Sequence, residues 1–108
     1  MRVSPDEFRQ LVEEALDGLP DRFATLVENV AIVIEEEPSD DDYELVEEGH
    51  ELLGVFRVVP PLPNQIVIFR GPILRVTRTA AAVRRQVRDT VIHELGHYFG
   101  LSDADMIH

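Results

Sequence analysis

Two histidines near the C-terminal end of the chain have the spacing needed to bind one metal ion together. His93 and His97 enclose Glu94 in the pattern H-E-x-x-H. Residues four apart on an α-helix are offset by only about 40°, so both imidazoles can reach one Zn²⁺ at roughly 2.0–2.1 Å. Glu94 points to the side of that face, where its carboxylate could deprotonate a metal-bound water. The spacing therefore predicts a hydrolytic zinc site.

A glycine and a carboxylate extend the pattern to H-E-x-x-H-x-x-G-x-x-D. Gly100 can adopt a positive φ at the end of a helix without strain, and a tight reversal there would fold the chain back toward the metal. A continued helix would instead carry Asp103 about 9 Å further along its axis. We therefore expect Asp103 as the third ligand, with His108 as its rival. The competing explanation is a surface helix that carries two histidines by chance, and each added element of the motif weakens it.

The motif resembles the metzincin variant in which Asp replaces the third histidine, and the chain resembles the small bacterial zincin-like metallopeptidases, or minimal zincins. The resemblance extends to segments 52–56 and 65–72 and implies a single zincin-like metallopeptidase domain over residues 1–108. Two departures from the full metzincin pattern are expected: Met106 follows Asp103 too closely for a separate Met-turn, and the residues after Asp103 are too few to form the C-terminal lobe. We therefore expect weak peptidase activity from the isolated chain, and stronger activity if a second copy or a partner completes the cleft.

The chemistry expected of these residues is that of a mononuclear zinc hydrolase. His93, His97 and Asp103 would hold one Zn²⁺ per chain, and an open fourth position for water is typical of a catalytic site. Glu94 would act as the general base and then pass its proton to the leaving amine. A zinc-binding module without turnover and a hydrolase of a non-peptide substrate such as RNA are the alternatives. Glu94 favours an enzyme, because a purely structural site has no use for a base.

The composition restricts the partners that the chain can have. A net charge of −11 disfavours nucleic acid and anionic membranes, so peptides or unfolded protein segments are the expected substrates. The chain has no cysteine, so N and O atoms must bind the metal.

The chain shows no apolar leader and no apolar run long enough to span a membrane, which predicts a soluble, cytoplasmic protein. All ten basic residues are arginine, a usage associated with high-GC bacterial genomes.

The charges are unevenly distributed along the chain. Residues 1–51 contain 17 Asp and Glu against 3 Arg, whereas residues 52–108 contain 4 against 7. This asymmetry predicts that the two halves pair across the fold. The acidic segment 35–48 is predicted to be a solvated loop, with Ca²⁺ binding by its three consecutive aspartates as the less favoured alternative. Arg84, Arg85 and Arg88 are predicted to form a solvated face, or less favourably to pair with this loop.

Hydrophobic periodicity predicts the elements that position the site. The first helix begins with a capping box formed by Ser4 and Glu7, and the last helix has Thr79 as its N-cap. The expected elements are helices at 5–19, 22–28, 72–76 and 80–99 and strands at 30–34, 53–58 and 65–69. This order predicts an α+β fold of the minimal zincin type, with a small mixed sheet packed on an N-terminal helix and a long C-terminal active-site helix.

Within the last helix, a polar stripe lies beside the apolar side and consists of Gln86, Thr90, His93 and His97. We expect Tyr98 to contribute to packing. By the resemblance, an extended substrate would add as a strand to the sheet edge formed by residues 65–69. An ordinary strand inside the sheet is an equally good interpretation of that segment.

Overall fold

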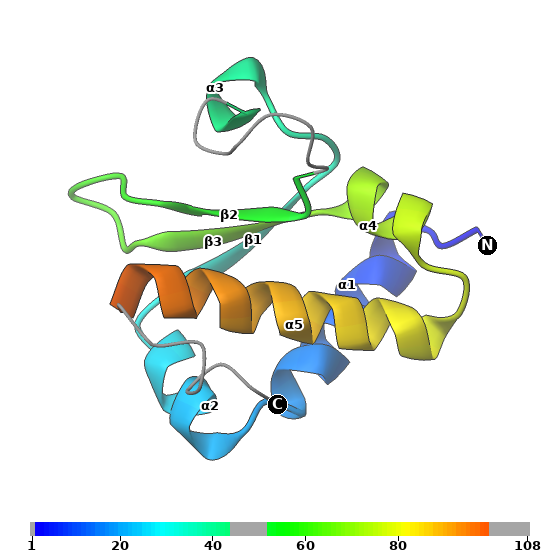
Figure 1. Ribbon diagram of the computed structural model, residues 1–108, viewed down its shortest axis with the longest axis horizontal. Coiled ribbons are helices and arrows are strands. Elements are labelled where there is room, and N and C mark those ends of the chain that lie inside the picture. The colour runs from blue at the N-terminus through cyan, green and yellow to red at the C-terminus, as the bar shows by residue number, and fades with distance from the viewer. Residues whose placement is uncertain (1, 44–51, 100–108) are drawn as a thin grey trace.

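A computed structural model describes residues 2–43 and 52–99 of the chain (Figure 1). Gly100, Asp103, Met106 and His108 lie outside the described residues, as does the last part of the acidic segment. The described chain is α+β and contains a mixed three-stranded sheet, which confirms the predicted class. Its elements are α1 (Pro5–Asp17), α2 (Asp21–Val27), β1 (Ala31–Glu35), α3 (Asp40–Tyr43), β2 (Gly54–Arg57), β3 (Gln65–Phe69), α4 (Arg70–Val76) and α5 (Ala80–Phe99).

The N-terminal ends of the two main helices are fixed by side-chain caps. The Glu7 backbone N–H donates to the Ser4 hydroxyl at 3.1 Å, and the Ser4 N–H donates back to Glu7 Oε1 at 3.3 Å. At α5, the Ala82 N–H donates to Oγ1 of Thr79 at 3.0 Å. These bonds satisfy N–H groups that have no partner inside the helix. Both caps therefore begin the helices where the sequence predicts.

Helices α1 and α5 pack on each other and on one face of the sheet (Figure 1). From α1, Phe8 and Val12 enter the core. A row of five α5 side chains is completely buried against them: Val83, Val87, Val91, Ile92 and Leu95. Burial of this row fixes the rotation of α5 about its own axis, and so determines which side chains at its C-terminal end remain accessible.

The strand at residues 65–69 is the central strand of the sheet, not its edge. The strand order is β1-β3-β2, with β1 parallel and β2 antiparallel to β3. The prediction that an added substrate strand pairs with 65–69 is therefore wrong, because both sides of β3 are already paired. The continuous apolar run Ile66–Phe69 is completely buried, which is typical of a strand covered on both faces. The edges of the described sheet are β1 and β2.

Side chains of β3 alternate between two apolar clusters on opposite faces of the sheet. Ile66 and Ile68 belong to the main core with α1 and α5. Val67 and Phe69 belong to a smaller cluster with Leu52 and Val55. In Figure 1, α3 lies on this second side of the sheet, away from α5.

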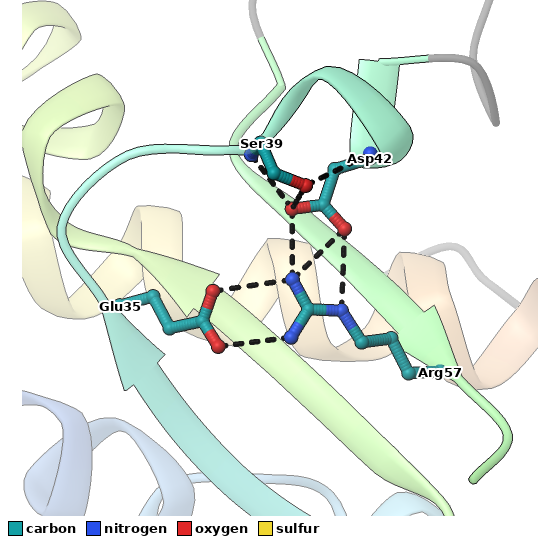
Figure 2. Close-up of polar contacts among 4 residues, drawn as sticks. All are labelled: Glu35, Ser39, Asp42 and Arg57. Carbon is teal, nitrogen blue, oxygen red and sulfur yellow. Dashed lines mark hydrogen bonds and ion pairs between the residues drawn. The ribbon is translucent and has the colours of Figure 1, made fainter.

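Most described residues of the acidic segment after β1 are exposed, as its composition predicts, but Asp42 is buried and paired instead of solvated. Asp42 in α3 is only 3% exposed. Nη2 of Arg57 lies 2.7 Å from Oδ2 of Asp42, and Nη1 lies 2.8 Å from Oε2 of Glu35 (Figure 2). The Ser39 N–H also donates to Oδ2 of Asp42, at 2.9 Å. An arginine on β2 thus joins the end of β1 to α3.

Ion pairs connect the acidic first half of the chain to the arginine-rich second half, as the charge asymmetry predicts. Arg70 pairs with Glu36 at 2.7 Å, Arg75 with Glu37 at 2.9 Å and Arg84 with Glu14 at 3.2 Å. Arg84 thus contacts α1 rather than the acidic segment. Within the two described ranges, no helix combines the length and apolarity needed to cross a lipid bilayer.

Candidate active site

The two histidines lie on one accessible face in the last turns of α5. Their ring centroids are 4.3 Å apart and the ring planes are tilted by 50°. Both side chains are exposed, although the neighbouring Leu95 is completely buried. The apolar row that fixes the rotation of α5 therefore leaves His93 and His97 together at the surface, as the helical spacing predicts.

The protonation preference of His93 suits a metal ligand. The His93 side chain is exposed, but its packed surroundings remove part of its solvent, which lowers the pKa of the imidazole, and the neighbouring His97 lowers it further. A metal binds only the neutral imidazole. Because a lowered pKa makes the imidazole lose its proton more easily, protons compete less with the metal for the ring nitrogen. The His93 ring is thus already biased toward the form that a metal requires.

Glu94 is the titratable group beside the histidines with the most perturbed environment. Its side chain is partly buried, and that burial raises the pKa of the carboxyl to about 7. Loss of solvent around a carboxylate disfavours its charged form, which explains the direction. A carboxyl with a pKa near neutrality can both take up and release a proton at physiological pH. This is the behaviour expected of a general base that later acts as an acid.

The edge strand β2 lies close to α5 along the predicted polar stripe. A Cβ atom on Gly54 would lie 2.5 Å from Cγ2 of Thr90, so only glycine fits at this crossing. Thr90 is buried, and its hydroxyl accepts a hydrogen bond of 3.2 Å from Nε2 of Gln86. The buried end of the stripe therefore contacts β2, whereas His93 and His97 form its accessible end.

Tyr98 connects the end of α5 to the β2–β3 hairpin, directly beside His97. Its ring stacks on Phe56 of β2, with centroids 4.1 Å apart and planes 13° apart. Nδ2 of Asn64 donates a hydrogen bond of 2.8 Å to the Tyr98 hydroxyl. The packing role expected of Tyr98 is correct. Sequence reasoning missed Phe56 and Asn64, because the hydrophobic pattern shows only which face of a strand is apolar and not which ring it meets.

The described donors fit two of the ligand positions of zinc. Within residues 2–43 and 52–99, no three His, Asp or Glu side chains converge to form a complete site. Two nitrogen ligands of a tetrahedral Zn²⁺ stand about 3.3 Å apart, a separation that rings with centroids 4.3 Å apart can reach. The other two predicted ligand candidates, Asp103 and its rival His108, lie outside the described residues. A paired-imidazole donor set with a nearby carboxylate suits zinc better than magnesium or calcium.

Two comparisons with known proteins show a similarity in family and in fold. The model of the family described as zincin-like metallopeptidase matches residues 27–108. A solved structure, that of a conserved hypothetical protein from Thermo thermophilus, has a similar fold with a TM-score of 0.59 and 24% sequence identity. That match covers 90% of this chain and 94% of the other. No curated protein matches the sequence.

Proposed function

The chain belongs to the zincin-like metallopeptidase family, and we propose that it is a zinc-dependent metallopeptidase that hydrolyses peptide bonds. The observation that carries the proposal is that α5 holds His93 and His97 together on an accessible face and carries the partly buried Glu94 directly after His93. Burial raises the pKa of the Glu94 carboxyl to about 7, a value that suits proton transfer near neutral pH. A zinc-binding module without turnover is the alternative.

In this proposal each residue has a distinct task. His93 and His97 hold Zn²⁺ through one ring nitrogen each, and Asp103 is proposed as the third ligand. A bound Zn²⁺ supplies Lewis acidity toward the scissile carbonyl and toward water. A carboxylate oxygen of Glu94 accepts a proton from the attacking water and donates it to the leaving amine.

The free edge of β2 is the proposed place for an extended substrate. Among the described residues, β2 pairs only with β3, so the backbone groups on its other side are available to a peptide. Gly54 brings this strand against α5 one turn before His93, and Tyr98 contacts it one residue after His97. Main-chain pairing there would align a peptide with the histidines and would provide affinity with little sequence specificity.

The experiment combines metal analysis with a peptide-cleavage assay. Native protein, His93→Ala, His97→Ala and Glu94→Gln are compared, with Arg85→Ala on an exposed face of α5 as the matched control. We expect about one Zn²⁺ per native chain, loss of zinc in both histidine variants, and zinc retained without cleavage in Glu94→Gln. Arg85→Ala should behave as the native protein does.

Three results would change the proposal. Stoichiometric zinc in both histidine variants would show that the motif is not the metal site. Zinc binding by a native protein that cleaves no peptide of a broad library would favour the non-catalytic module. Separate Asp103→Ala and His108→Ala variants identify the third ligand, because only loss of the true ligand weakens zinc binding.

A further inference from the structure

The strand edge on the opposite side of the sheet, that of β1, is also unpaired among the described residues. The parallel register aligns Ala31 with Gln65, and the Ala31 N–H donates to the Asn64 carbonyl at 2.9 Å. In a parallel ladder, alternate residues direct both backbone groups toward the same neighbour. The backbone groups that point toward β3 are therefore those of Ala31, Val33 and Glu35. The backbone N–H and C=O groups of Ile32 and Ile34 point away from the sheet. Two residues of β1 thus present a complete set of free backbone groups.

A groove runs between this edge and α1. Its cavity volume is about 390 Å³, and Val12, Leu16, Ile32 and Ile34 contribute its apolar lining. Two charged residues of α1, Arg9 and Glu13, also line it, and both are exposed. An apolar edge strand of this kind attracts another strand unless it is covered or carries charge. Here the charges are Glu35 at the end of β1 and one residue of each sign on the neighbouring helix.

We propose that β1 pairs antiparallel with β1 of a second copy of this chain, about a two-fold axis at Val33. This register places Ile32 opposite the partner's Ile34 and Ile34 opposite the partner's Ile32, so the outward backbone groups form four hydrogen bonds. Ala31 then lies opposite the partner's Glu35, and no two like charges of the strands meet. The two sheets become one sheet of six strands.

The charges beside the strand favour a second copy over an unrelated partner. A two-fold axis reverses the direction of α1, so Arg9 approaches the partner's Glu13 while Glu13 approaches the partner's Arg9. Opposite charges that meet in this reciprocal way are a property of self-association. Glu35 adds little repulsion, because Arg57 already binds its carboxylate at 2.8 Å. The pairing uses neither β2 nor the histidines, so it stands independently of the proposed peptidase activity.

The first test is a disulfide at the two-fold axis. Val33 would face the partner's Val33 as a non-hydrogen-bonded pair with Cα atoms about 4.5 Å apart, which a disulfide can bridge. The chain has no cysteine of its own, so Val33→Cys carries a single thiol. We expect Val33→Cys to oxidise to a covalent dimer at low micromolar concentration. Leu62→Cys, which is 61% exposed in the β2–β3 hairpin, is the control and should remain largely monomeric.

The second test reverses the charges of α1, with sedimentation equilibrium as the readout. The native chain should reach twice its 12.3 kDa mass as its concentration rises. Arg9→Glu and Glu13→Arg should each weaken dimerisation by about tenfold or more, and the double variant should restore it. Circular dichroism checks that each variant remains folded. A native chain that stays monomeric at millimolar concentration, or single variants that dimerise as tightly as the native chain, would overturn the proposal.

Discussion

Gly54 of β2 and Thr90 of α5 lie so close together that a Cβ atom on the glycine would be 2.5 Å from the threonine Cγ2. The same atom would be 2.9 Å from the Val67 carbonyl oxygen in the middle of the sheet. Neither neighbour can easily move, because Thr90 and Val67 are both buried. This contact therefore fixes the separation between the edge strand and the helix that carries His93 and His97.

Replacing Gly54 by alanine should destabilise the fold and disturb the site. Overpacking of a closed contact costs about 1–3 kcal/mol, and relief by movement of β2 would widen its separation from α5. We expect a lower urea midpoint together with weaker zinc binding. Gly18→Ala is the matched control, since its Cβ would meet nothing nearer than 3.5 Å and its φ of −91° suits any residue. Equal midpoints for Gly54→Ala and Gly18→Ala would contradict this account.

Arg57→Gln should destabilise the protein much more than loss of an exposed arginine. The variant removes the cation from the nearly buried Asp42 and leaves that carboxylate with the Ser39 bonds alone. Removing one partner of a buried ion pair costs about 3–5 kcal/mol, and partial exposure of Arg57 lowers our expectation to about 2–3 kcal/mol. The control is Arg84→Gln, because Arg84 and Glu14 are 40% and 42% exposed and such pairs contribute under about 1 kcal/mol. Chemical unfolding measures both differences.

Asp42 should make the stability of the fold depend on acid pH. Burial raises the pKa of its carboxyl, but the Ser39 N–H, the Arg57 guanidinium and the Ser39 hydroxyl together outweigh burial and lower the pKa overall. Because the pKa is lowered in the folded state, the stabilisation by ionised Asp42 is complete above the pKa of about 3.9 that an aspartate has in the unfolded chain. This stabilisation is lost as the pH falls through the pKa of the folded state. The stability difference between the native protein and Asp42→Asn should therefore shrink below about pH 4. The exposed Asp41→Asn is the control and should show a smaller pH-dependent difference.

Glu94→Gln should stabilise the metal-free protein at alkaline pH. Burial raises the pKa of Glu94 in the folded protein to about 7. The contribution of the protonated carboxyl to the free energy of unfolding is therefore fully present below the pKa that Glu94 has in the unfolded chain, and it is lost as the pH rises through about 7. Glutamine does not titrate and avoids this loss. With a chelator present, the variant should gain on the order of 1–3 kcal/mol over the native protein between pH 5 and pH 8.5. The exposed Glu28→Gln should show no such trend, and a pH-independent difference for Glu94→Gln would argue against the raised pKa.

The sequence predicts local features of this protein well, because they depend on neighbours in the chain. The capping box of Ser4 and Glu7, the helix over 80–99 and the shared face of His93 and His97 all follow from spacing along one element. Each of these features requires only that a helix forms. The structure confirms all three.

Features that depend on packing between distant segments could not be predicted in this way. Residues 65–69 show the apolar run of a buried strand, but only the strand order shows that this strand is central and that β2 is an edge strand among the described residues. The charge run around Asp42 gives no sign that one of its carboxylates is buried by an arginine fifteen positions away. The raised pKa of Glu94 likewise depends on burial by the surrounding fold, which the H-E-x-x-H pattern does not encode.

The pairing of acidic and basic halves has a consequence for how the chain folds during its synthesis. Strand β1 pairs with β3, and α1 packs on α5, so the first half emerges from the ribosome before its main packing partners exist. It then carries 17 acidic residues against 3 arginines, and this self-repulsion keeps it expanded. The arginines that neutralise Glu14 and Glu36 are translated later, together with β3, α4 and α5. Nascent chains should therefore remain protease-sensitive until α5 has left the exit tunnel.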